Sequence, residues 1–91
     1  MVAVSASRSG DGWVCLVSVD QHGRRTQHTV TVSIAELARW ASGSGQEDVE
    51  ELVRRSFDFL LEREPATSIL ARFDLSAIQR YFPEYDRIFR R

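Results

Sequence analysis

The chain has 91 residues, with a hydrophobic fraction of 43% and a charged fraction of 27%, which suit a globular protein and exclude an intrinsically disordered one. Its 12 basic and 13 acidic residues give a formal net charge of −1 at pH 7. This balance argues against a dedicated nucleic-acid-binding protein, because such proteins usually carry a clear basic excess. The length favours a single domain over residues 1–91 with one hydrophobic core.

All basic residues are arginines, which excludes a Schiff-base lysine and the phosphate-binding lysine of a Walker motif. Cys15 is the single cysteine and cannot form an intramolecular disulfide. The sequence begins without the basic and apolar regions of a signal peptide, and no apolar stretch approaches the ~20 residues of a membrane span. We therefore expect a soluble, cytoplasmic protein.

Three segments in the first third of the chain have the patterns of β-strands. Residues 2–6 alternate between apolar and small or polar side chains, and residues 13–19 are apolar on both faces, as in a central strand. Residues 26–33 are apolar on one face only, which suits a sheet with one face toward water. The turn segments RSGDG and QHGRR separate them. We predict a short antiparallel β-meander, or a hairpin if the first segment does not join the sheet.

The rest of the chain has sequence patterns that predict helices. Ser33 followed by Glu36 is the spacing of a capping box and predicts a helix over residues 34–41, which the glycines of SGSG then end. Its expected inward residues are Ile34, Leu37, Ala38 and Trp40. Ser44 and Glu47 repeat the capping-box spacing before a second helix.

This second helix is expected over residues 46–63, where apolar side chains recur at helical spacing. Two acidic–basic pairs four residues apart, Glu50 with Arg54 and Glu51 with Arg55, are predicted to stabilise its exposed face. The apolar face widens at FDFLL, so we predict a central helix that is buried on several sides. The predicted core residues are Phe57, Leu60 and Leu61.

Three short helical segments are predicted after Pro65, which ends the second helix. Residues 66–70 suggest a helical turn, and Asp74 is the expected N-cap of a helix over residues 75–81. Pro83 suits the first turn of a final helix, EYDRIFRR. The predicted fold class is α+β, with a meander or hairpin followed by about four helical segments packed on one face of the sheet.

The segment SFDFLLEREPATSILARFDLSAIQRYFPEY, residues 56–85, resembles a small family of uncharacterised prokaryotic proteins with an SF-FLLEREP helix followed by SIL-FDL-I-YFPEY. The resemblance covers about a third of the chain. It implies a self-contained domain and no known activity, so it assigns no functional residue.

Cys15 is a candidate nucleophile with His22 or His28 as its base, or these residues could belong to a metal site. Cys15 lies in an apolar strand and His22 in a turn, and no CxxC or HxxxH spacing occurs. The pattern favours a structural role for the cysteine. We predict no metal, no cofactor and no catalytic residues.

Carboxylates of the second half of the chain are candidates for general acid–base chemistry, which needs two of them to converge in one pocket. They are Glu62, Glu64, Asp74, Glu84 and Asp86. Glu62 and Glu64 would point in different directions on a helix, and Asp74 has a capping role. Solvated or capping roles are the preferred interpretation.

Basic residues form two local groups. Arg80, Arg87, Arg90 and Arg91 alternate with Tyr81, Phe82, Tyr85 and Phe89 at the C-terminal end. Aromatic side chains between arginines are typical of a single-strand nucleic-acid surface, but the same pattern arises when the aromatic rings face a core and the arginines face water. Arg24 and Arg25, beside His22, form a smaller basic group in a predicted turn that is a plausible contact loop.

We hypothesise from these patterns a non-enzymatic protein–protein interaction module, self-associating or binding a partner protein. The alternative is a nucleic-acid-binding accessory protein that uses the C-terminal arginine–aromatic segment. A homodimer is expected through the edge of the strand at Thr26–Ser33, which has no proline and little charge to prevent strand pairing. If the first strand covers that edge, VAVSAS becomes the exposed one.

Overall fold

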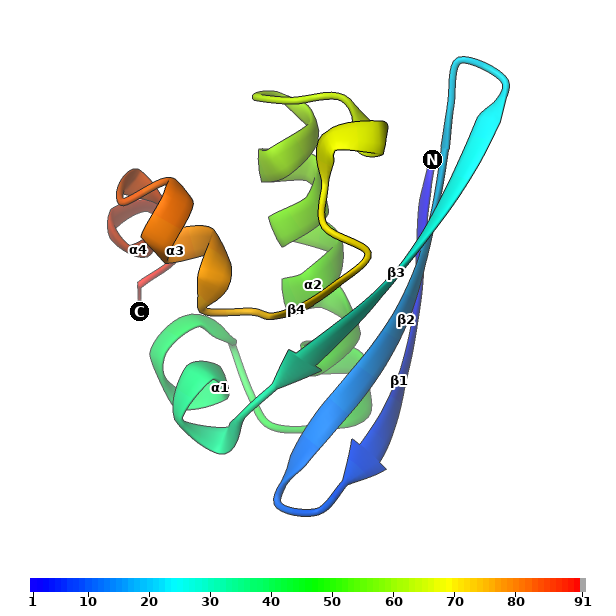
Figure 1. The fold of residues 1–91 in the computed structure, drawn as a ribbon. Coiled ribbons are helices and arrows are strands. Elements are labelled where there is room, and N and C mark those ends of the chain that lie inside the picture. Colours follow the sequence, from blue (N-terminus) through cyan, green and yellow to red (C-terminus); the bar gives the residue numbers. More distant parts are fainter. Residues whose placement is uncertain (91) are drawn as a thin grey trace.

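The structure is a computed structural model that describes residues 1–90 (Figure 1). Its sheet has four strands in the order β1-β2-β3-β4, comprising β1 (Val2–Ser9), β2 (Gly12–Gln21), β3 (Arg24–Val32) and β4 (Arg72–Asp74). The first three strands form the predicted antiparallel meander, with β2 in the centre. β4 is parallel to β3 and was not predicted.

Two-residue loops set the register of the meander. In the β2–β3 loop, His22 and Gly23 both have positive φ angles, 55° and 76°, as a type I′ turn requires. In the β1–β2 loop, Gly10 has a φ of 57°. Glycine adopts these angles without steric cost, so the predicted turn segments close both hairpins tightly.

β4 corrects two predictions. Its backbone pairs with β3 through the bonds Thr29 N–H to Ala71 O, at 2.8 Å, and Leu75 N–H to Thr31 O, at 2.9 Å. The β3 edge is therefore occupied over Thr29–Thr31 and is not free for a second chain there. Asp74 belongs to this strand and accepts a hydrogen bond from the Thr31 hydroxyl, so it is not a helix N-cap.

The β1 edge is covered at one point by the longest helix, α2 (Gln46–Leu61). The Ala6 N–H donates to Glu50 Oε2 and the Gln46 side chain donates to Ala6 O, both at 2.9 Å. Glu50 is thus engaged with the sheet and makes no ion pair with Arg54. Arg54 instead pairs with Glu51 at 2.7 Å and with Asp58 at 2.9 Å, so the predicted pairing pattern is wrong.

The first helix, α1 (Ile34–Trp40), begins at the predicted capping box of Ser33 and Glu36. Leu37 and Trp40 are buried as expected, whereas Ile34 and Ala38 are exposed. Only the side of this short helix that carries Leu37 and Trp40 meets the core. The second capping box lies one residue later than predicted, because Asp48, not Glu47, accepts from the Gly45 amide.

α2 is buried on two sides, as the sequence predicted. Phe57 meets His28 on β3 and Phe73 on β4, with ring centroids 5.3 and 6.1 Å apart. Phe59 points the other way and contacts rings of the C-terminal segment. These rings belong to Phe82, Tyr85 and Phe89. Phe57 and Leu60 are core residues as predicted, but Leu61 is only partly buried.

Three short helical segments follow, namely the 3-10 helix η1 (Ala66–Ser68), α3 (Ala77–Tyr81) and α4 (Glu84–Phe89). α3 begins two residues after the predicted position because residues 75 and 76 form the turn that leaves β4. All four α-helices lie on one side of the sheet and leave the other face bare (Figure 1). The α+β fold class is confirmed. No helix among residues 1–90 combines the length and apolar character needed to cross a bilayer.

Candidate functional site

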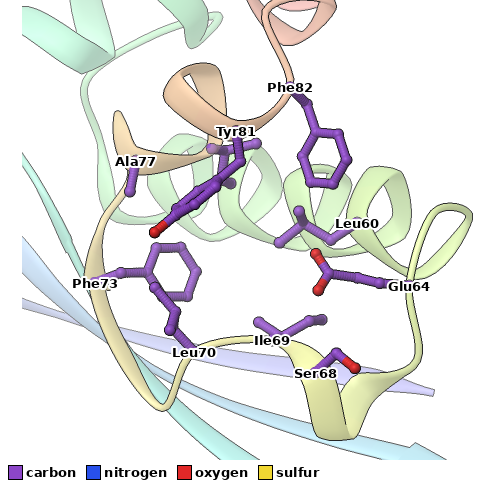
Figure 2. Close-up of a pocket in the computed structure, with 10 residues that line it drawn as sticks. Leu60, Glu64, Ser68, Ile69, Leu70, Phe73, Ala77, Tyr81 and Phe82 are labelled. Carbon is purple, nitrogen blue, oxygen red and sulfur yellow. The ribbon is translucent and has the colours of Figure 1, made fainter.

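A groove of about 400 Å³ opens between the end of α2, the segment from η1 to β4, and α3 (Figure 2). We call it the α2–α3 groove. Its lining residues are Leu60, Glu64, Ser68, Ile69, Leu70, Phe73, Ala77, Ile78, Tyr81 and Phe82. Residues from four elements meet here only because β4 pairs with β3 and brings the chain back beside α2.

The floor of the groove is apolar, and its rim exposes large hydrophobic side chains. Leu60 and Ile78 are buried, whereas Leu70 is 50% exposed and Tyr81 is 68% exposed. Figure 2 shows the rings of Phe73, Tyr81 and Phe82 around the hollow. Apolar side chains that remain in water beside a hollow are typical of a surface that binds a partner or ligand.

Among the described residues that line the groove, Glu64 alone is charged, and its carboxylate points toward the hollow near Leu60 (Figure 2). Among residues 1–90 no side chain forms an ion pair or hydrogen bond with this carboxylate. The neighbouring Arg63 is engaged elsewhere: its guanidinium lies 3.6 Å from the Phe59 ring centroid and pairs with Glu84 at 3.3 Å. The groove therefore combines apolar surface with an uncompensated negative charge.

The structure does not bring Cys15 and the histidines into a catalytic arrangement. Cys15 is fully buried, and burial, with a smaller contribution from Glu50, raises the pKa of its thiol to about 12. Such a thiol is protonated at neutral pH and is a poor nucleophile. Both ring nitrogens of His28 are occupied, one by Thr26 Oγ1 at 2.9 Å and the other by Leu70 O at 2.8 Å.

The candidate carboxylates do not converge in one pocket. Asp74 is bonded to Thr31, and Glu62 and Glu84 each lie beside Arg63, at 3.4 and 3.3 Å. A hydrogen bond from its own backbone amide, helped by Arg63, lowers the pKa of Glu84. Of the predicted candidates, only Glu64 lines the groove.

Asp86 has a structural role that the sequence did not reveal. It is buried and accepts hydrogen bonds from Arg39 Nη2 and Trp40 Nε1, both at 2.9 Å, so that α4 is joined to α1. Hydrogen bonds from Arg39 first and Trp40 second lower the pKa of the Asp86 carboxyl to about 2. Arg90 adds a longer contact at 3.7 Å.

In the C-terminal segment, the aromatic rings mostly face the core and the arginines face water, which is the second of the two arrangements that the sequence allowed. Tyr85 and Phe89 are buried and stacked on each other, and the Tyr85 hydroxyl lies 2.7 Å from Ser56 Oγ. Burial raises the pKa of Tyr85. Phe82 is partly buried, which leaves Tyr81 as the exposed ring. The exposed arginines are Arg80, Arg87 and Arg90, and Arg91 lies outside the described residues.

The tip of the β2–β3 hairpin forms another hollow, of about 310 Å³, against η1, with His22 and Arg24 in its lining. Arg25 faces away and pairs with Asp20 at 3.0 Å. This hollow has no exposed hydrophobic rim, so it gives a weaker indication of binding than the α2–α3 groove.

The residues that sequence reasoning missed are Leu70, Phe73 and Tyr81, as parts of one site. Phe73 lies in the three-residue strand β4, which is too short to show a period. Leu70 and Tyr81 lie in other segments and come beside Phe73 only in the folded chain. Comparison with protein-family models, with curated proteins and with solved structures found no match for this chain. The resemblance of residues 56–85 to an uncharacterised family therefore stays an expectation.

Proposed function

We propose that the protein is a non-enzymatic interaction module that binds an apolar segment of a partner protein in the α2–α3 groove. The observation that carries the proposal is the exposure of Leu70 and Tyr81 beside an apolar hollow. Leaving such side chains in water gains nothing for folding, whereas covering them with a partner removes apolar surface from water. A cytoplasmic setting, expected from the sequence, belongs to the same proposal.

The groove also indicates the chemistry of its occupant. A volume of about 400 Å³ suits a few apolar side chains. The unpaired carboxylate of Glu64 favours a positive charge next to them, because opposite charges attract strongly where apolar walls exclude water. The expected occupant is a partner segment with neighbouring apolar residues and an adjacent lysine or arginine.

The nucleic-acid alternative has no comparable support. The charged side chain of the groove is acidic and would repel phosphate. The aromatic rings of the C-terminal segment that would stack on bases are largely in the core, apart from Tyr81. We therefore do not propose it further.

Selection of random peptides displayed on phage tests the proposed function. The full chain is the target, and the double variant Leu70→Ser/Tyr81→Ser is the counter-target, since both residues are exposed and their loss leaves the core intact. Peptides retained by the wild-type chain and by the control Ile88→Ser, but not by the double variant, support the groove. Failure to enrich any peptide that the double variant rejects would overturn the proposal.

The charge preference has a separate readout. For a selected peptide, Glu64→Gln is expected to weaken binding about tenfold, the loss of ~1.4 kcal/mol that one favourable charge contact contributes. The Ile88→Ser control is expected to leave affinity unchanged. Equal affinities of wild type and Glu64→Gln would keep the apolar groove as a binding site and reject the cationic occupant.

A further inference from the structure

β4 is the last strand of the sheet, and one edge of its backbone is open. Ala71 O and Leu75 N–H bond to β3, at 2.8 and 2.9 Å. In a parallel ladder with this register, Phe73 also directs its N–H and C=O to β3, while the backbone groups of Arg72 and Asp74 point away from β3. Among residues 1–90, no hydrogen bond reaches these backbone groups of Arg72 and Asp74. Their donors and acceptors can therefore pair with another strand.

The open edge lies beside the α2–α3 groove. Figure 2 shows the chain that carries Phe73 along one side of the hollow, with the side chains of Leu70 and Phe73 directed into it. Arg72 and Asp74, on either side of Phe73, are exposed. Within residues 1–90, β3 is the only element in extensive contact with β4, so no helix packs along the opposite edge.

A strand added at this edge would place alternate side chains on the helix side of the sheet, because successive side chains of a strand point to opposite faces. The position that pairs with Phe73 points to the same face as Phe73, and therefore toward the groove. The positions before and after it point to the bare face, next to Arg72 and Asp74. The same segment can thus bond to the edge through its backbone and fill the groove with its side chains.

We propose that the partner segment binds as an extended strand added to β4, with alternate apolar side chains in the α2–α3 groove. This inference rests on the proposed function and assigns the conformation of the occupant. In this mode of binding, backbone hydrogen bonds supply affinity and side-chain pockets supply specificity. A helix in the groove would bury apolar side chains but would leave the backbone groups of Arg72 and Asp74 unpaired.

The short length of β4 agrees with this role. A strand of three residues offers few backbone groups, and short edge strands discourage pairing with unrelated chains. A segment is therefore retained only if its side chains also fit the groove. Arg72 forms no ion pair among residues 1–90, so the position beside it on the added strand favours an acidic residue.

The peptides selected on phage by the wild-type chain test the conformation. Their apolar residues should recur at every second position, whereas a bound helix requires the third and fourth positions. Synthetic copies of one selected peptide, each with a single N-methyl group on its backbone, give a second readout by calorimetry. Methylation should weaken binding about tenfold or more at alternate positions, where it removes an N–H that bonds to β4, and should change it little at the positions between.

On the side of the protein, Arg72→Pro removes an edge donor, and Arg72→Ala is the matched control that keeps the N–H. The Arg72 N–H does not bond to β3, so the proline leaves the ladder between β3 and β4 intact. We expect similar melting temperatures for the two variants and an affinity for the selected peptide that is about tenfold lower in Arg72→Pro.

The outcomes separate this inference from the proposed function. Apolar residues at helical spacing, or equal tolerance of N-methylation at every position, would overturn the added strand and keep the groove as a binding site. Equal affinities of folded Arg72→Pro and Arg72→Ala would also overturn it. If the proline variant does not fold, the N-methylated peptides alone decide. Failure to select any peptide would overturn the proposed function, and this inference with it.

Discussion

Asp86 and Glu64 are carboxylates of the C-terminal half with opposite surroundings. Asp86 is buried and held by Arg39 and Trp40, whereas Glu64 faces the α2–α3 groove with no ion-pair partner among residues 1–90. The sequence does not distinguish the two carboxylates, because the partners of Asp86 lie 46 and 47 residues away in the chain. Long-range contacts of this kind leave no signature in local spacing.

The Asp86→Asn substitution tests the role of the buried carboxylate. The folded-state pKa of about 2 lies below the ordinary value of 3.8, so ionised Asp86 adds stability at neutral pH that is lost as pH falls from about 4 toward 2. We expect a lower urea midpoint for the variant at about pH 6 and a difference that shrinks by about pH 2.5. A pH-independent difference would contradict the assigned cause.

Leu60→Ala tests the prediction that Leu60 is a core residue. Leu60 is 4% exposed, and removing its buried methyl groups is expected to destabilise the fold by about 2–5 kcal/mol. Ile88→Ala is the control, since this side chain is exposed and its loss should change stability by less than ~0.5 kcal/mol. Equal urea midpoints for the two variants would show that Leu60 does not pack as described.

At the scale of elements, long periodic segments were predictable and short ones were not. The sixteen residues of α2 and the three strands of the meander could be predicted because their apolar side chains recur at regular spacing in the sequence. β4 has three residues and gains its hydrogen bonds from β3, so only the folded chain reveals it. Asp74 was misread as an N-cap for the same reason.

The capping box of α1 gives a graded prediction. Ser33 Oγ accepts from the Glu36 amide, while Glu36 accepts from the Ser33 and Ser76 amides and so also joins α1 to the start of α3. Ser33→Ala should cost about 1 kcal/mol, and Glu36→Ala about 2 kcal/mol. The exposed Glu47→Ala is the control. A smaller loss for Glu36→Ala than for Ser33→Ala, in chemical denaturation, would contradict the described geometry.

At the scale of the whole molecule, the α2–α3 groove depends on how the elements assemble, because its lining comes from four elements. The sequence predicted that one face of β3 meets water. It did not predict the groove, because the groove requires the parallel pairing of β4 with β3.

The fold is also predicted to need no metal. Among residues 1–90, no group of three His, Cys, Asp or Glu side chains is placed to hold an ion. Excess chelator should leave the melting temperature of the purified, untagged chain unchanged. Stoichiometric zinc in that sample, or a lower melting temperature after chelation, would contradict the prediction.

We propose above that the α2–α3 groove binds apolar groups that carry a positive charge. Heteronuclear NMR of the isotope-labelled chain with phenethylammonium, and with phenylpropionate as a control of similar size and opposite charge, tests this most directly. We expect phenethylammonium to shift the amide signals of Leu70, Phe73 and Tyr81, phenylpropionate to shift them less, and Glu64→Gln to remove the difference. Equal shifts from both compounds, or shifts confined to other surfaces, would contradict it.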